Sequence, residues 1–143
     1  MLFEYEDAQR MRDRGIIFRF RENEDLEVIF PDNILGQLLD EFREMTNMCP
    51  IPIEHKTAWM FCEALIAADR PDPYFDKTEL PKQMTVVLSS NPSVICTFET
   101  SDGLRLSYGF HTRDRAIAKL KRRNEEKLAQ LRQLEQDRQI LTE

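Results

Sequence analysis

The chain has 143 residues, of which 41% are apolar and 32% are charged, and only four are glycine. This composition excludes a disordered chain and predicts one domain with a single core. The net charge of −6 hides an asymmetry, because residues 1–110 carry 11 basic and 20 acidic side chains, whereas residues 111–143 carry 9 and 6. The acidic body argues against non-specific nucleic-acid binding, although the basic end could make local contacts.

The beginning of the chain predicts neither a signal peptide nor a membrane anchor. Residues 1–14 are mixed in charge, and Phe3, Ala8 and Met11 lie loosely on one side of a short helix that this segment could form. No apolar run approaches the roughly 18–20 residues that cross a membrane. We therefore expect no membrane insertion.

Residues 16–30 predict an antiparallel hairpin. The pairing that we expect on the apolar face is Ile16 with Phe30, Phe18 with Val28 and Phe20 with Leu26. The other face then sets Arg19 against Glu27 and Arg21 against Asp25, and two opposite-charge pairs in one register support this pairing. The two arginines could instead bind a phosphate, but salt-paired arginines on a solvated face are the more common arrangement.

The segment after this hairpin predicts an amphipathic helix. Pro31 ends the strand, and Asp32 or Asn33 can cap a helix that follows. The apolar residues at helical spacing are Ile34, Leu35, Leu38, Leu39, Phe42 and Met45. This pattern is typical of a helix of about 13 residues that lies on a sheet.

Residues 53–68 predict a second helix, which is apolar nearly all round. Such a helix is buried on most of its sides. It runs either through the centre of the domain, which is the arrangement we favour, or partly along a partner. In the second case Trp59 and Met60 would be natural anchors.

Residues 69–81 contain three of the seven prolines and therefore predict no regular element. The segment is either an ordered loop or a recognition segment. Its two aromatic residues, Tyr74 and Phe75, would pin the loop to the body or contact a partner protein. Both residues are therefore candidates for protein binding.

Residues 84–110 predict a meander of three strands, 84–88, 93–98 and 104–110. A two-residue turn at Asp102 and Gly103 would mix apolar and polar side chains on each face of the second hairpin. A three-residue loop with Gly103 in a left-handed conformation separates them. The pairs that it creates are Phe98 with Leu106, Cys96 with Tyr108 and Val94 with Phe110 on one face, and Glu99 with Arg105 and Thr97 with Ser107 on the other.

Residues 113–143 predict one long charged helix. In a heptad register the core positions are Ile117, Leu120, Asn124, Lys127, Leu131, Leu134, Arg138 and Leu141. Five of these eight are apolar, and an eleven-residue period also collects Leu128. We expect residues 116–120 to pack on the sheet. From about Asn124 onward a helix of about 45 Å reaches beyond the body, so we expect another protein or a second copy to cover it.

The first turns of this helix are rich in cations, and their basic residues are Arg113, Arg115, Lys119, Lys121, Arg122 and Arg123. This cluster could contact the phosphates of a nucleic acid. Against such binding, no aromatic residues interleave with the cations, and the helix becomes acidic beyond Asn124. Lipid binding would also need a broad apolar face with Trp or Phe, which this segment lacks.

No catalytic or metal-binding pattern stands out. The available soft or imidazole ligands are Cys49, His55, Cys62, Cys96 and His111, and their spacing fits no common zinc site. His55 and Cys62 share a helix face but lie about 10 Å apart along the axis, too far for a direct hydrogen bond. We expect no metal, no cofactor and free thiols in a reducing cytoplasm.

The sequence thus predicts an α+β fold in the order ββ-αα-βββ-α. A mostly antiparallel five-stranded sheet is covered on one face by two helices, in a domain of residues 1–112, and residues 113–143 form a helix that partly projects. The expected function is that of a non-catalytic interaction or regulatory protein, which would bind through the C-terminal helix, the loop of residues 69–81, or both. The candidate binding residues are Tyr74, Phe75, Arg122, Arg123, Leu128, Leu131 and Leu134. The alternatives are a nucleic-acid-associated factor that uses residues 113–123 and an enzyme whose site the sequence does not reveal.

Overall fold

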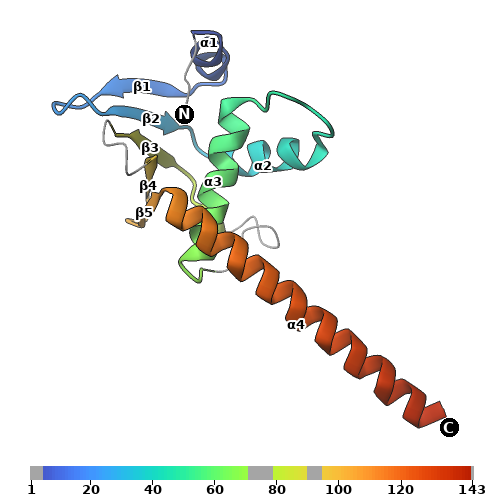
Figure 1. The fold of residues 1–143 in the computed structure, drawn as a ribbon. Helices are drawn as coiled ribbons and strands as arrows, with labels where there is room; N and C mark the ends of the chain where they lie inside the picture. Colours follow the sequence, from blue (N-terminus) through green and yellow to red (C-terminus); the bar gives the residue numbers. More distant parts are fainter. Residues whose placement is uncertain (1–4, 71–78, 90–94, 143) are drawn as a thin grey trace.

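The computed structural model of the chain describes residues 5–70, 79–89 and 95–142. The elements are α1 (Tyr5–Asp13), β1 (Ile17–Phe20), β2 (Leu26–Phe30), α2 (Ile34–Glu44), α3 (Ile53–Ala67), β3 (Met84–Leu88), β4 (Cys96–Thr100), β5 (Arg105–Tyr108) and α4 (Phe110–Thr142). All five strands form one antiparallel sheet in the order β1-β2-β3-β4-β5 (Figure 1). The predicted α+β class and element order are confirmed, and the short helix at the start of the chain is α1.

The first hairpin has the predicted register, with Arg19 opposite Glu27 and their side chains 2.8 Å apart. The expected pairing of Arg21 with Asp25 holds only for the backbone, where the Arg21 N–H donates to the Asp25 carbonyl. The Arg21 guanidinium instead binds Glu27 at 2.7 Å and reaches across β3 to Glu99 at 2.9 Å. The long Arg21 side chain binds these two carboxylates because they lie on the same face of the sheet, whereas Asp25 lies in the turn.

The second hairpin confirms the three-residue loop and the register that it implies. Gly103 has a φ of +90°, a left-handed conformation that glycine adopts without strain. The strand ends earlier than predicted, however, because the Gly109 carbonyl accepts a hydrogen bond from Arg113 N–H, and the helix begins at Phe110. Phe110 is therefore not a strand residue and is 70% exposed, while its expected partner Val94 lies outside the described residues.

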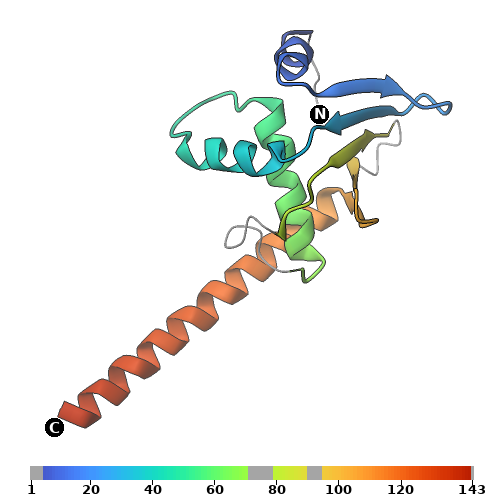
Figure 2. The same ribbon diagram turned by 180° about the vertical axis from the view of Figure 1, so that it is seen from behind.

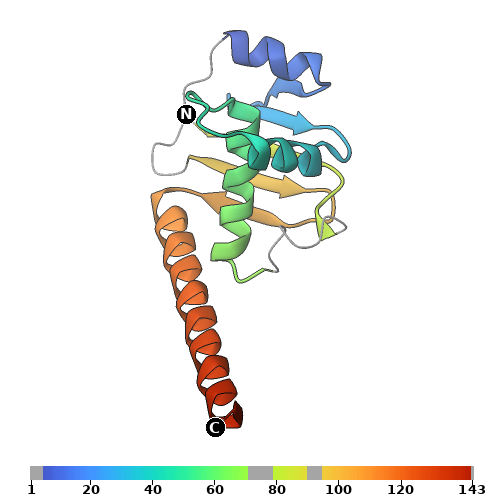
Figure 3. The same cartoon turned by 90° about the vertical axis from the view of Figure 1, so that its right-hand side faces the viewer.

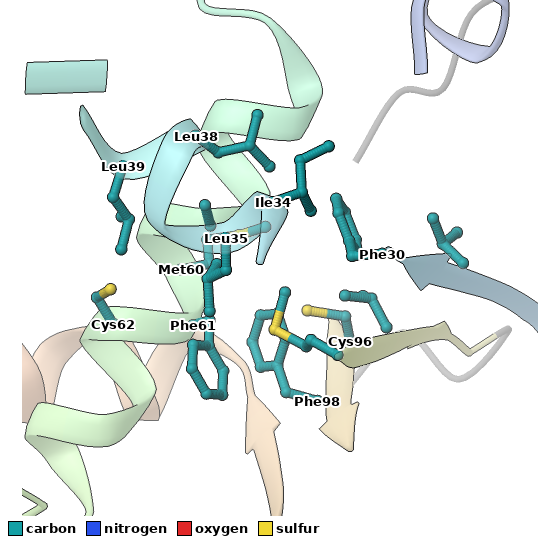
Figure 4. Close-up of a cluster of buried hydrophobic side chains, with 14 of the residues drawn as sticks. Phe30, Ile34, Leu35, Leu38, Leu39, Met60, Phe61, Cys62, Cys96 and Phe98 are labelled. Carbon is teal, nitrogen blue, oxygen red and sulfur yellow. The ribbon is translucent and has the colours of Figure 1, made fainter. Parts of the chain in front are cut away.

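One face of the sheet is covered by α3, and α2 packs on the outer side of α3. Figures 1 and 3 show this layering, with α3 between the sheet and α2. Every residue of α3 is buried except Lys56 and Trp59. The helix runs through the centre of the domain, as the apolar pattern predicted. Figure 4 shows the core between these layers, where Phe61 of α3 meets the Phe98 ring edge-on at 5.4 Å.

The start of α2 is not capped by a side chain, contrary to the sequence prediction. The helix has 11 residues, and Asn33 occupies the cap position with a φ of +64°. Its side chain makes no capping hydrogen bond, and its backbone N–H donates to the Lys82 carbonyl at 2.8 Å. The neighbouring chain segment therefore holds this end of the helix, which the local sequence could not reveal.

The helix α4 is one continuous element of 33 residues, about 50 Å long. Its first turns lie against the body, and the remainder leaves the body without bending back (Figure 2). The expected projection is therefore observed. The residues expected to pack on the sheet pack elsewhere, because Ala116 and Leu120 contact Ile66 and Ala67 at the end of α3.

The core predicts a clear difference between two phenylalanines of the sheet, Phe98 on β4 and Phe20 on the edge strand β1. Replacing the fully buried Phe98 by alanine should lower the free energy of unfolding by about 3–5 kcal/mol, because it leaves a cavity against Phe61 and Tyr108. Replacing Phe20, which is 76% exposed, should change it by no more than about 0.5 kcal/mol. Urea denaturation followed by circular dichroism measures both, and equal losses would contradict the described core.

Candidate functional site: the C-terminal helix and the groove at its base

The base of α4 is fixed to the end of α3 by apolar and polar contacts. Ala116 is fully buried against Ile66 and Ala67. The Lys119 ammonium donates to the Ala67 carbonyl at 2.6 Å and lies 2.6 Å from the Asp69 carboxylate. A cation is favourable there because the carbonyls at the end of a helix carry partial negative charge. Lys119 also lowers the pKa of the Asp69 carboxyl below its usual range.

We name residues 124–141 the distal helix. No other part of the described chain shields these residues from solvent. Every one of these residues is exposed. The exposed apolar residues of the distal helix are Leu128, Leu131, Leu134, Ile140 and Leu141, with exposures from 53% to 86%. A soluble helix normally turns such residues toward a core, so the distal helix has an apolar surface without a cover from this chain.

The apolar residues of the distal helix form a stripe rather than a scatter. At about 100° per residue, Leu128, Leu131, Leu134 and Leu141 fall within about 140° of the circumference. Ile117, 40% exposed at the base of the helix, continues the stripe toward the body. Of the apolar residues above, Ile140 alone points away from it. The predicted binding residues Leu128, Leu131 and Leu134 are therefore brought together on one side of an accessible helix.

The six basic residues of the candidate nucleic-acid site do not share one face. Successive residues of a helix are rotated by about 100° around its axis, and therefore Arg113, Lys121 and Arg122 point in three different directions. Lys119 is engaged by Asp69 and the end of α3. Arg115 is exposed, and Arg123 is half-buried. Arg115, Lys119, Arg122 and Arg123 fall within about 100° of the circumference, whereas Arg113 and Lys121 point to other sides of the helix.

A groove of about 360 Å³ opens beside the first turn of α4, and we name it the base groove. Its lining includes Ile51, Lys56, Trp59, Phe110 and Arg113. Trp59 stacks on Phe42 at 5.1 Å, which holds the indole at the wall of the groove. Phe110, the strand residue that sequence reasoning misplaced, contributes its exposed ring. The lining is mostly apolar and carries the cations Lys56 and Arg113 and the carboxylate of Glu63.

The predicted loop residues Tyr74 and Phe75 lie outside the described residues. The contribution of that loop to binding therefore stays a prediction, and the structure adds the base groove as a surface that the sequence did not indicate. The residues that line the base groove come from four separated parts of the chain. The periodicity of any one segment therefore does not predict the groove.

A second feature that sequence reasoning missed is a partly buried ionic network between α1, α2 and α3. Arg10 binds Glu54 at 2.7 Å, and Arg14 binds Glu41 through two nitrogens at 2.8 and 3.0 Å. His55 completes it with a 2.7 Å contact from Nε2 to Glu41. The guanidinium of Arg14, and to a lesser extent His55, lowers the pKa of Glu41. The network fastens α1 to the body.

The network is not arranged like a catalytic centre. The Nδ1 atom of His55 is buried without a hydrogen-bond partner among the described residues, and the nearest carboxylate oxygen of Glu54 is 3.9 Å away. A nucleophile with an exposed reacting atom is not part of the described network. In the ranges 5–70, 79–89 and 95–142, no group of three or more metal-ligating side chains occurs either.

Comparisons of the chain with protein-family models, curated proteins and solved structures found no match. Among the helices that the structure describes, none combines the length and the apolar character needed to cross a membrane.

The ionic network predicts a specific pH dependence of stability. The pKa of Glu41 is lowered in the folded state. The ionised Glu41 carboxylate therefore contributes fully to the free energy of unfolding when the pH is above 4.5, the usual pKa of the group. This contribution is lost as the pH falls through the lower folded-state pKa. Replacing Glu41 by glutamine should cost about 1 kcal/mol at pH 7, the size of a partly exposed ion pair, and nothing near pH 2. Urea midpoints across this pH range measure the effect.

Glu126, which is exposed on the distal helix, provides the control. Its replacement by glutamine should leave the pH dependence of the urea midpoint unchanged. If the Glu41 variant lost stability in acid as steeply as the unmodified chain, the proposed role of the network would be wrong.

Proposed function

We propose that this chain is a small non-catalytic interaction protein, an adaptor or regulator, that binds another protein chain through the distal helix. The observation that carries the proposal is the complete exposure of residues 124–141, including their apolar stripe, on a helix fixed rigidly at its base. The body is too small to cover a helix of about 50 Å.

The energetics of an uncovered helix support binding. Most helical stability in proteins comes from packing an apolar face against another surface rather than from helix propensity. Burying each leucine of the stripe would contribute about 1.5–3 kcal/mol. A partner groove that accepts Leu128, Leu131 and Leu134 would thus supply both helix stability and affinity, as in helix-in-groove recognition.

Charge gives this surface a preference for acidic partners. Arg122 is exposed and Arg123 is half-buried immediately before the distal helix begins. Cations at the rim of an apolar contact raise the association rate with an acidic surface more than they raise the final affinity. These two residues therefore act as steering groups in the proposal.

We place this activity in the cytoplasm. The described cysteines are free thiols, with Cys62 and Cys96 buried and Cys49 exposed. Burial raises the pKa of the Cys96 thiol to about 12, which keeps it unreactive. An exposed free thiol such as Cys49 persists most easily in a reducing compartment.

Nucleic-acid binding is the second candidate, favoured by the exposed cations Arg113, Arg115, Lys121 and Arg122. Their spread around the helix makes a continuous phosphate track less favourable than protein docking. The two candidates separate by salt, because phosphate contacts weaken binding steeply as the salt concentration rises. An apolar helix contact changes little under the same conditions.

The stripe provides a matched test of protein binding. In a nuclease-treated pull-down, the full chain should retain a partner protein that is lost when Leu131 is replaced by aspartate or when the chain ends at Arg123. Replacing Ile140, an exposed apolar residue outside the stripe, by aspartate should leave retention intact. With the purified partner, Leu131→Asp should raise Kd at least about 100-fold, the equivalent of about 3 kcal/mol.

Circular dichroism of each bait checks that the body remains folded. If all four baits retained the same proteins in the same amounts, the distal helix would have no role in binding and the proposed function would be wrong.

A further inference from the structure

We infer that the distal helix is covered by an acidic amphipathic helix of another protein, which lies along α4 on the same side as α3. The inference rests on the proposed function and names the chemistry of its partner. Two observations carry it: the face of α4 that packs on α3 continues along the distal helix, and the charged residues on this face are all basic.

The face of α4 that packs on α3 does not end where α3 ends. At the base this face is marked by Ala116 and Leu120, which contact the end of α3. Successive residues are rotated by about 100°, so six positions farther along α4 point within about 20° of the direction of one of these two residues. We name these six positions the seam, and they are Arg123, Lys127, Leu131, Leu134, Arg138 and Leu141.

The spacing of the seam is that of a contact between two helices. Its members follow one another at intervals of three or four residues, the intervals at which side chains of one helix enter the spaces on another. The seam is about 27 Å long from Arg123 to Leu141. Figures 1 and 2 show that α4 continues past the end of α3, and residues 124–141 are all exposed. A second helix can therefore lie along the distal helix in the place that α3 occupies at the base.

The charged members of the seam are all basic. They are Arg123, Lys127 and Arg138, and the other three members are leucines. The acidic residues of the distal helix all point at least about 40° outside the seam, and they are Glu125, Glu126, Glu135 and Asp137. A partner that covers the leucines therefore comes close to three cations. Acidic side chains on that partner make the contact favourable, whereas basic ones would make it unfavourable.

The chain itself shows this pairing of charges where the seam begins. The Asp69 carboxylate, just beyond the end of α3, lies 2.6 Å from the Lys119 ammonium. Lys119 is the main cause of the lowered pKa of Asp69, and the nearby guanidinium groups of Arg122 and Arg123 add to it. An acidic side chain of the body thus faces the cations at the base of α4. The partner helix supplies the corresponding acidic side chains farther along, opposite Lys127 and Arg138.

Two other occupants match the seam less well. A second copy of this chain would bring the same three cations to the contact, and like charges across a contact are destabilising. The phosphate backbone of a nucleic acid would attract the cations, but it would leave Leu131, Leu134 and Leu141 without apolar cover. An acidic amphipathic helix satisfies the leucines and the cations together.

A pair of synthetic helical peptides tests the chemistry of the partner. Both have about four heptads with leucine at positions a and d, and one carries glutamate and the other lysine at the flanking positions e and g, which the long cations of a facing helix reach. In fluorescence anisotropy the full chain should bind the glutamate peptide at least about tenfold more tightly, a difference of about 1.4 kcal/mol. Equal affinities, a preference for the lysine peptide, or no binding of the glutamate peptide at about 100 μM chain would overturn the inference.

Matched variants of the chain locate the contact. Arg138 lies on the seam, whereas Arg132, which is also exposed on the distal helix, points about 120° away from it. Replacing Arg138 by glutamate should weaken binding of the glutamate peptide at least about tenfold, and replacing Arg132 by glutamate should change it by less than about threefold. The variant with glutamate at both Lys127 and Arg138 should prefer the lysine peptide. Equal losses in the two single variants would show attraction by net charge alone and would overturn the inference. Circular dichroism verifies that each variant remains helical.

Two further measurements address the other occupants. Sedimentation equilibrium of the full chain should give the single-chain mass of 17.0 kDa at about 100 μM, and a dimer that Leu131→Asp dissociates would overturn the inference. A single-stranded oligonucleotide that bound more tightly than the glutamate peptide, and lost its binding with Arg138→Glu, would also overturn it. The proposed function is judged separately by the pull-down. A partner protein lost with Leu131→Asp, together with no preference for the glutamate peptide, would leave that function standing and contradict the acidic helix alone.

Discussion

The burial of α3 on nearly all sides is the constraint on which the other elements depend. An apolar helix of 15 residues needs cover in several directions, and the sheet, α2 and the base of α4 each supply one. Its two buried carboxylates have partners on neighbouring elements, since Glu54 binds Arg10 of α1 and Glu63 accepts a hydrogen bond from Tyr108 of β5. The positions of α1, β5 and α4 therefore follow from the need to cover α3 and to pair its buried polar groups. Together these elements enclose α3.

The same closure explains why α4 cannot be covered from within the chain. Its first turns already complete the cover of α3, through Ala116 and the bond from Lys119 to Ala67. The core then has no further surface to offer, yet the helix continues for more than four turns as the distal helix. The apolar stripe and the base groove are thus two uncovered apolar surfaces of the described chain that both lie along α4. This geometry is the reason that we propose docking as the function.

The sequence predicted those features that depend on neighbouring positions and failed where distant segments meet. Cross-strand alternation fixed the register of both hairpins, including the left-handed Gly103, because a shift of one residue exchanges the two faces. Arg21 shows the limit, because its partner Glu99 is 78 residues away and only the folded sheet brings them together. Phe110 was assigned to a strand on local propensity, whereas the Gly109 carbonyl starts a helix there. Of the candidate site, the stripe was predictable from its period, and the base groove was not, because four parts of the chain form it.

Amide hydrogen exchange along α4, measured without and with a bound partner, tests most directly whether the distal helix takes its cover from outside the chain. In the chain alone we predict strong protection near Ala116 and weak protection over residues 124–141, because a helix without tertiary contacts opens frequently. With a bound partner, protection of residues 124–141 should rise toward that of the base. Equal and strong protection of both parts in the chain alone would show that the distal helix is stable by itself, and would contradict the account.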